Sequence, residues 1–93
     1  MEEQAKQVAE LLKILANSTR LLIICALMER PMNVGEIAQT MPKVSSSVLS
    51  QNLMLLKAHR ILDNEKSGQH TIYSITDHRV EEIMHTLKKY YCQ

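Results

Sequence analysis

The chain has 93 residues, of which 45% are hydrophobic and 23% are charged, and its formal net charge is +1. This balance excludes a disordered tail, and the length fits one small domain, residues 1–93, whose stability would benefit from a partner subunit. The near-neutral charge gives no global argument for nucleic-acid binding, because binding by charge alone normally accompanies a strongly basic domain.

Two helices are predicted in the first third of the chain. Apolar residues recur at helical spacing between residues 3 and 15, which indicates an amphipathic helix. Ser18 is the expected N-cap of a second helix, from Thr19 to about Glu29, which is apolar nearly all round and therefore belongs to the core. Its apolar run, residues 21–28, is far short of the roughly 20 residues that a membrane span needs.

Two further helices follow, separated by a short turn. Asn33 and Glu36 have the spacing of a capping box at the start of a short third helix, which Pro42 closes. Residues 45–47, three serines, open a fourth helix. Its expected apolar face consists of Val48, Leu49, Leu53, Leu55 and Leu56.

A hairpin and a last helix complete the chain. Residues 62–75 predict two strands, with Ser67-Gly68 as the turn and β-forming residues from Thr71 onward. Thr76-Asp77 is the expected cap of a last helix, residues 77–91, in which apolar residues again recur at helical spacing.

The predicted order of elements is α-α-α-α-β-β-α. It describes a mainly α fold with a small β-hairpin, a winged helix-turn-helix. The helix-turn-helix would span residues 33–58 and the wing residues 62–75. In this arrangement the second helix of the motif enters the major groove of DNA.

The start of the fourth helix has side chains suited to DNA. Serine hydroxyls bind phosphates or bases, and glutamine binds adenine at two atoms. A serine triplet followed by an amide is also an ordinary capped and solvated helix start, but the preceding helix and the following hairpin favour DNA contact. Residues 37–62 contain no Asp or Glu. The predicted DNA contacts are Ser45, Ser46, Ser47, Ser50, Gln51, Lys57, Lys66, Gln69 and His70.

Four segments carry a resemblance to a known family: LANSTRL at 15–21, VGEIA at 34–38, SSSVLSQNL at 45–53, and the wing at 68–76. Together they resemble the ArsR/SmtB family of bacterial winged-helix repressors along essentially the whole chain. The resemblance implies a homodimer joined through the first and last helices, about residues 3–15 and 77–91, whose affinity for operator DNA is set by an inducer.

The metal sites of that family do not match this sequence. Its metal-sensing members have Cys-Val-Cys at the start of the third helix, where this chain has Asn33-Val34-Gly35. On the last helix the cluster is superficially similar to a second family site, but its spacing departs from the family's pattern. We interpret it as a solvated charged face and predict no metal or other cofactor, with a metal-responsive repressor as the alternative. The cluster comprises Asp77, His78, Glu81, Glu82 and His85.

The two cysteines suggest a different inducer. Taken alone, Cys25 is a small core residue and Cys92 a thiol in the tail. However, the segments around them resemble the redox-sensing subgroup of the family, in which a cysteine pair at these positions responds to persulfides or oxidants. The resemblance implies that a bridge between the two thiols would change the spacing of the recognition helices and alter operator binding. Lys88 and Lys89 favour a thiolate at Cys92.

We therefore predict a DNA-binding transcriptional repressor that partners double-stranded operator DNA and a second copy of itself. It has no membrane partner, and we expect it in the cytoplasm, since the N-terminus has no apolar signal region. No glycine-rich phosphate loop or activated nucleophile points to an enzyme. Two alternatives stay open: an anti-repressor that displaces another protein, and a winged helix that only contacts proteins and has no inducer.

Overall fold

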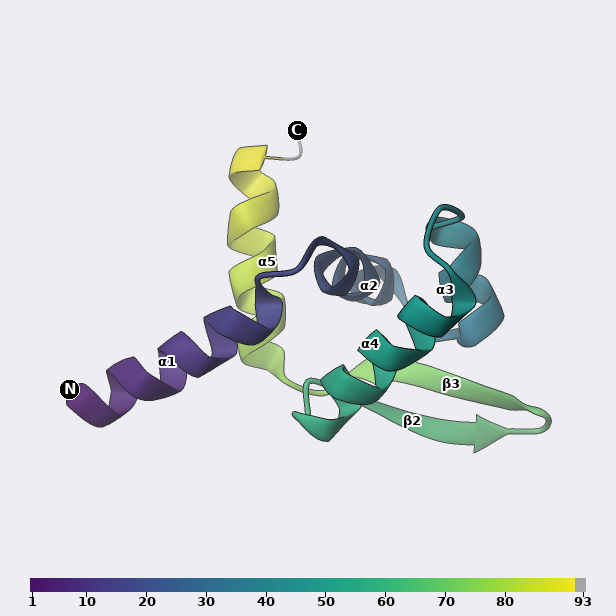
Figure 1. Ribbon diagram of the computed structural model, residues 1–93, viewed down its shortest axis with the longest axis horizontal. Coiled ribbons are helices and arrows are strands. Elements are labelled where there is room, and N and C mark those ends of the chain that lie inside the picture. The colour runs from purple at the N-terminus through teal and green to yellow at the C-terminus, as the bar shows by residue number, and fades with distance from the viewer. Residues whose placement is uncertain (92–93) are drawn as a thin grey trace.

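The computed structural model describes residues 1–91 and arranges them as five helices and a three-stranded sheet (Figure 1). The prediction of a mainly helical winged-helix fold is confirmed. Figure 1 shows α1 projecting from one end of the molecule and the hairpin tip from the other. The elements are α1 (Glu2–Leu15), α2 (Ser18–Glu29), β1 (Met32–Asn33), α3 (Val34–Thr40), α4 (Ser46–Ala58), β2 (Leu62–Ser67), β3 (His70–Ile75) and α5 (His78–Tyr91).

Helix α2 lies at the centre of the core because apolar residues cover most of its circumference. Ile23 and Ile24 are fully buried, and α2 packs against α3, α4, α5 and β3. The predicted N-cap, Ser18, was wrong by one residue. The N-cap is Asn17, whose Oδ1 accepts a hydrogen bond from the backbone N–H of Arg20 at 3.1 Å. Asparagine and serine cap equally well, so the helix begins at the earlier of the two.

The sheet has one strand more than the sequence predicted. The two-residue strand β1 pairs antiparallel with β3, with Met32 opposite Tyr73, and gives the strand order β1-β3-β2. In the hairpin, Ser67 still pairs with His70, so the loop is Gly68-Gln69 and not Ser67-Gly68. Gly68 has a φ of 63°, as the first loop residue of a type II′ turn requires.

Side-chain caps fix the starts of α3 and α5. The predicted capping box is present: Asn33 Oδ1 accepts from the backbone N–H of Glu36 at 2.8 Å, and Glu36 Oε1 accepts from the backbone N–H of Asn33 at 3.0 Å. At α5, Asp77 Oδ1 accepts from the backbone N–H of Arg79 at 3.1 Å. Thr76 does not cap the helix, because its hydroxyl donates instead to the carbonyl oxygen of Arg60 at 3.1 Å.

The core is aliphatic and joins all five helices to the sheet. Helix α1 contributes only Leu15 to its buried part, so most of α1 is exposed. Across residues 1–91 no single helix is long and apolar enough to cross a membrane; α1 and α2 reach that length only as a pair bent by 91°. The buried residues are Leu15, Ile23, Ile24, Leu27, Met32, Ile37, Met41, Leu49, Leu53, Leu56, Ile61, Leu62, Val80 and Met84.

Candidate nucleic-acid interface

A helix, a tight turn and a second helix form the centre of the candidate interface. Helix α3 ends at Thr40, and the backbone N–H of Val44 donates to the carbonyl oxygen of Met41 at 3.0 Å within the turn. Ser45 then caps α4, because its Oγ accepts from the backbone N–H of Val48 at 3.2 Å. The prediction that the serine triplet opens this helix is confirmed. The cap occupies the hydroxyl oxygen of Ser45, whereas Ser46, Ser47, Ser50 and Gln51 are exposed farther along α4.

Helix α4 has a buried apolar face and an exposed polar face. Leu49, Leu53 and Leu56 are each 1% exposed or less. Val48 is 40% exposed, so its predicted place on the apolar face was wrong. On the exposed side, four short or amide side chains form what we call the α4 stripe: Ser46, Ser47, Ser50 and Gln51.

The hairpin extends from the end of α4 as a wing. Its tip contains three of the predicted DNA contacts, Lys66, Gln69 and His70, and all three are exposed. The His70 ring Nδ1 lies 3.5 Å from Asn33 Nδ2, so the base of the tip touches the start of α3. The wing therefore meets the helix-turn-helix here, beside the pairing of β1 with β3, and again at the end of α4.

The second junction involves a predicted DNA contact. Lys57 Nζ donates to Asn64 Oδ1 of β2 at 3.0 Å, which ties the last turn of α4 to the wing. Lys57 is exposed and Asn64 is half-buried, and the two residues are seven positions apart in the sequence. The sequence placed Lys57 in the interface but gave no sign of this bond.

A longer-range contact from α2, which the sequence did not predict, holds α4 in place. Arg20 of α2 donates from Nε to Asn52 Oδ1 at 2.9 Å and from Nη1 to the carbonyl oxygen of Ile14 at 3.0 Å. Asn52 donates in turn to the carbonyl oxygen of Val48 at 2.9 Å. Arg20 therefore connects the end of α1, the start of α2 and the middle of α4.

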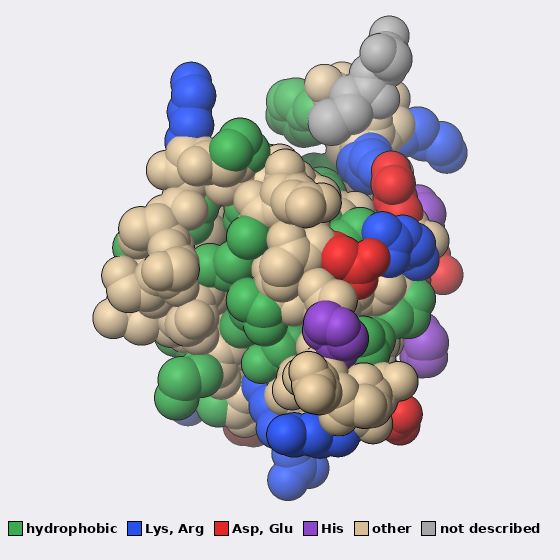
Figure 2. Space-filling model, turned by 90° about the vertical axis from the view of Figure 1, so that its right-hand side faces the viewer, with side chains coloured by type: hydrophobic (Ala, Val, Ile, Leu, Met, Phe, Trp, Pro, Cys, Tyr) green, Lys and Arg blue, Asp and Glu red, His purple; other side chains and the backbone are tan. Residues whose placement is uncertain are grey.

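The charge distribution on this side of the molecule is uneven. Figure 2 shows the molecule from the side of the hairpin tip and α3. Tan polar atoms cover much of its left half, the acidic side chains lie in its right half, and Lys and Arg side chains lie at the lower edge, at the upper left and among the acidic side chains on the right. Glu36 of α3 forms an ion pair with Arg30 at 3.1 Å. The hydrogen bond from the backbone N–H of Asn33, followed by that from Arg30, lowers the pKa of Glu36.

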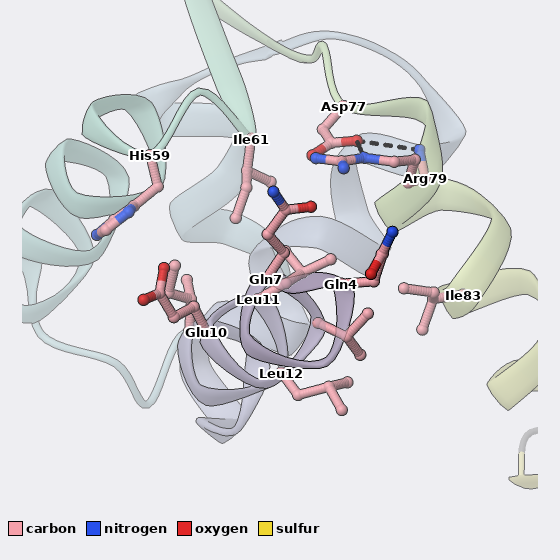
Figure 3. Close-up of a pocket in the computed structure, with 12 residues that line it drawn as sticks. Gln4, Gln7, Glu10, Leu11, Leu12, His59, Ile61, Asp77, Arg79 and Ile83 are labelled. Carbon is pink, nitrogen blue, oxygen red and sulfur yellow. Dashed lines mark hydrogen bonds and ion pairs between the residues drawn. The ribbon is translucent and has the colours of Figure 1, made fainter. Parts of the chain in front are cut away.

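At the opposite end, α1 and α5 border a groove of about 620 Å³ (Figure 3). Figure 3 shows Leu11 of α1 and Ile83 of α5 among the side chains around it, with the Asp77–Arg79 ion pair at its rim. The hydrogen bonds from Arg79 lower the pKa of Asp77. In and around the groove, which Val8 and Leu12 line, both helices expose large apolar side chains. They are Val8, Leu12, Leu87, Tyr90 and Tyr91.

Three of the candidate metal ligands in and beside α5 are engaged in ion pairs, and one of the two cysteines lies within the described residues. Among residues 1–91, no group of three or more His, Cys, Asp or Glu side chains is arranged to hold a metal ion. His78 pairs with Glu81 at 3.0 Å, while Asp77 pairs with Arg79 at 2.8 Å. Cys25 is half-buried in α2, and Cys92 lies outside the described residues.

With this geometry established, comparison with known sequences assigns a family. Residues 14–93 match the HxlR-like helix-turn-helix family. The chain belongs to this family. As an HxlR-like protein it is a transcriptional regulator with a helix-turn-helix DNA-binding domain and not an enzyme.

Two curated relatives are similar along nearly the whole chain. The transcriptional activator HlyU of Vibrio cholerae is 32% identical over 93 residues, covering 100% of this chain and 85% of that protein. The biofilm growth-associated repressor of Xylella fastidiosa is 30% identical over 92 residues, covering 99% of this chain and 80% of that protein.

Solved structures share the fold of this HxlR-like chain. Reduced HlyU from Vibrio cholerae has a TM-score of 0.92 at 32% identity, covering 100% of this chain and 97% of that one. The DNA-binding domain of Mb0332 from Mycobacterium bovis, described as homodimeric and as a possible ArsR-family regulator, has a TM-score of 0.78 at 26% identity, covering 94% and 80% of the two chains.

Proposed function

We propose that this HxlR-like chain is a dimeric repressor of the ArsR/SmtB type, which binds operator DNA through α4 and the wing and responds to thiol modification. The observation that carries DNA recognition is the α4 stripe, exposed on a helix that is capped at Ser45 and buried on its other face. Short hydroxyl and amide side chains at a helix N-terminus suit both phosphates and base edges. The similarity to Mb0332 supports the ArsR assignment.

In this proposal the remaining predicted contacts surround the stripe. Lys57 lies in the last turn of α4, while Lys66, Gln69 and His70 lie in or beside the hairpin loop. Lysine side chains there would neutralise phosphates and so position the stripe, whereas Ser50 and Gln51 would distinguish bases. Ser45 would act through its cap, since its Oγ already accepts from a backbone N–H.

A selection experiment tests DNA recognition. The protein is incubated with a library of random 30-base-pair duplexes, and the bound fraction is sequenced. We expect one enriched motif, with affinity for it reduced at least tenfold in Ser50→Ala/Gln51→Ala, since each good bidentate base contact is worth about 1–3 kcal/mol. Lys6→Ala, exposed on the side of α1 away from Val8 and Leu12, is the matched control and should bind as the unaltered protein does. If the protein enriches no motif, and its weak binding to DNA does not fall as the salt concentration rises, it is a module that contacts proteins instead.

The dimer would form on the apolar surface of α1 and α5. Val8, Leu12 and Leu87 are 54%, 50% and 42% exposed, which is a large apolar area for a 93-residue chain to leave in water. Homodimerisation of the similar Mb0332 domain supports this assignment. Sedimentation analysis should give a dimer, and Leu12→Glu should give a monomer, whereas the neighbouring Lys13→Glu should stay dimeric.

The proposed inducer acts through Cys25 and Cys92. Helix α5 packs against α2, which contains Cys25, and Cys92 follows α5 in the sequence. A polysulfide would transfer sulfane sulfur to one thiolate. The second thiolate would then attack the modified sulfur and expel hydrosulfide, leaving a disulfide. With a peroxide, sulfenate formation and loss of water give the same bridge.

Mass spectrometry tests this route directly. After treatment of the reduced protein with inorganic tetrasulfide, we expect a peptide pair joined through Cys25 and Cys92, together with weaker binding to the selected motif. Cys25→Ser and Cys92→Ser should both abolish the shift in affinity while leaving DNA binding of the reduced protein intact. Unlinked cysteines and unchanged affinity would contradict the thiol mechanism but not DNA binding.

The direction of regulation needs a test of its own, because one relative is named an activator and another a repressor. A reporter gene placed behind the selected motif should be silenced by the protein alone if it is a repressor. An anti-repressor would leave that reporter unchanged and act only when a second DNA-binding protein occupies the motif.

A further inference from the structure

Met54 is the most exposed large apolar side chain of α4. It is 70% exposed, whereas Leu49 and Leu53 of the same helix are each 1% exposed. A single exposed apolar residue is ordinary on a protein surface. The position of Met54 relative to the α4 stripe indicates a functional reason for its exposure.

Helical periodicity places Met54 on the side of the stripe. It follows Ser50 by four residues and Gln51 by three, the spacings at which side chains lie on one helix face. Ser47 is seven residues earlier, two turns or about 10.5 Å along the axis. The exposed surface of α4 therefore runs from hydroxyl groups at its start, through an amide, to a thioether near its middle.

This sequence of groups matches the chemistry of a major-groove floor. Hydroxyl and amide groups pair with the donors and acceptors of base edges, but the thymine C5-methyl group offers only an apolar surface. Methionine is unbranched and adaptable, so it can cover a methyl group without a fixed geometry. The absence of acidic residues between positions 37 and 62 leaves no charge beside Met54 in the sequence that would repel the phosphates.

We propose that Met54 is a specificity-determining residue that contacts the C5-methyl group of a thymine in the operator. This inference rests on the proposed function, in which α4 enters the major groove. It adds an apolar contact to the predicted site, whose other members are all polar or charged.

Replacement of single thymines by deoxyuridine in the selected motif tests the contact, because uracil lacks only the methyl group. We expect that at one thymine in each half-site the unaltered protein loses about three- to fivefold in affinity, the scale of one buried methyl group. Met54→Ala should bind the thymine duplex more weakly by a similar factor and lose its preference for thymine over uracil at that position. Met54→Leu should keep the preference.

Val48→Ala is the matched control, since Val48 is 40% exposed but lies on a different side of α4. It should retain the full thymine preference. Circular dichroism confirms that each variant is folded before binding is measured. If the protein binds the motif but Met54→Ala shows the same uracil profile as the unaltered protein, the inference is overturned and the proposed function stands. If no duplex is bound at all, both are overturned.

Discussion

Arg20 of α2 donates a hydrogen bond from Nε to Oδ1 of Asn52 in α4, over 2.9 Å and 32 positions of sequence. The same guanidinium donates to the carbonyl oxygen of Ile14, at the end of α1. One side chain thus holds the proposed recognition helix at a fixed orientation to the proposed dimerisation helix. Because two copies of α4 must match half-sites about 34–36 Å apart, a fixed orientation within each protomer matters for binding.

Arg20→Lys should therefore weaken both folding and binding. Lysine keeps the charge but lacks the planar fork that reaches two acceptors at once. We expect the free energy of unfolding in urea to fall by about 1–3 kcal/mol, the scale of hydrogen bonds to charged groups. Arg30→Lys is the control, because its ion pair with Glu36 is exposed and should be worth less than about 1 kcal/mol. Equal losses of unfolding free energy in the two variants would show that the hydrogen bond from Arg20 to Asn52 adds nothing to stability.

Arg60→Gly should stabilise the protein. Arg60 has a φ of 60°, and it follows the C-cap of α4, where the backbone N–H of Ile61 donates to the carbonyl oxygen of Leu56 at 3.0 Å. This is the Schellman position, which glycine occupies without the cost of a left-handed L residue. We expect a gain of up to about 1 kcal/mol in thermal or urea unfolding.

The converse change gives the control for backbone strain. Gly68 has a φ of 63°, and an added Cβ would meet no atom within 4 Å. Gly68→Ala should therefore lose stability through its backbone alone, by about as much as Arg60→Gly gains. Destabilisation by both substitutions would mean that the Arg60 side chain contributes more than its conformation costs.

These features also show how far the sequence alone could predict the fold. Apolar residues at helical spacing, and in α2 an apolar run, identified all five helices, although the apolar face of α1 stays mostly exposed. It could not decide between Asn17 and Ser18 as N-cap, since both are good caps and the choice depends on where α1 ends. Strand β1 was missed because two residues have no period. Its existence depends on Tyr73 and Ile72, about forty positions away.

The candidate site divides in the same way. The exposure of Ser47, Ser50 and Gln51 follows from local periodicity and was predictable. The Arg20–Asn52 and Lys57–Asn64 hydrogen bonds join separate elements, and no local sequence pattern predicts them. Met54 was not predicted as a contact because an apolar residue within a helix is normally assigned to the core.

Glu36→Gln should make stability less dependent on pH. The backbone N–H of Asn33 and then the Arg30 side chain hold the pKa of Glu36 below its ordinary value of 4.5. A carboxylate with a lowered pKa stabilises the fold above that ordinary value, and the stabilisation is lost as the pH falls through the folded pKa. The stability gap between the unaltered protein and Glu36→Gln should thus be widest near pH 7 and narrow as the pH falls below 4.5.

Urea unfolding at a series of pH values measures this gap. Gln39→Ala on the same helix is the control, because neither residue titrates and its gap should not follow the titration of a carboxylate. A gap for Glu36→Gln that stays constant down to pH 3 would show that the neutral capping box is as strong as the charged one.

Lys57 has two possible roles, a tether to the wing and a phosphate contact, and salt dependence distinguishes them. Its Nζ donates to Asn64 Oδ1 at 3.0 Å, but an ammonium group has two further protons to donate. If each Lys57 of the proposed dimer also neutralises a phosphate, Lys57→Gln should reduce the slope of log K against log salt by about 1.8, since each phosphate contributes about 0.9. Asn64→Ala removes only the tether and should leave the slope unchanged, as should Lys6→Gln on α1. An unchanged slope in Lys57→Gln would assign Lys57 to the wing alone and remove it from the DNA contacts.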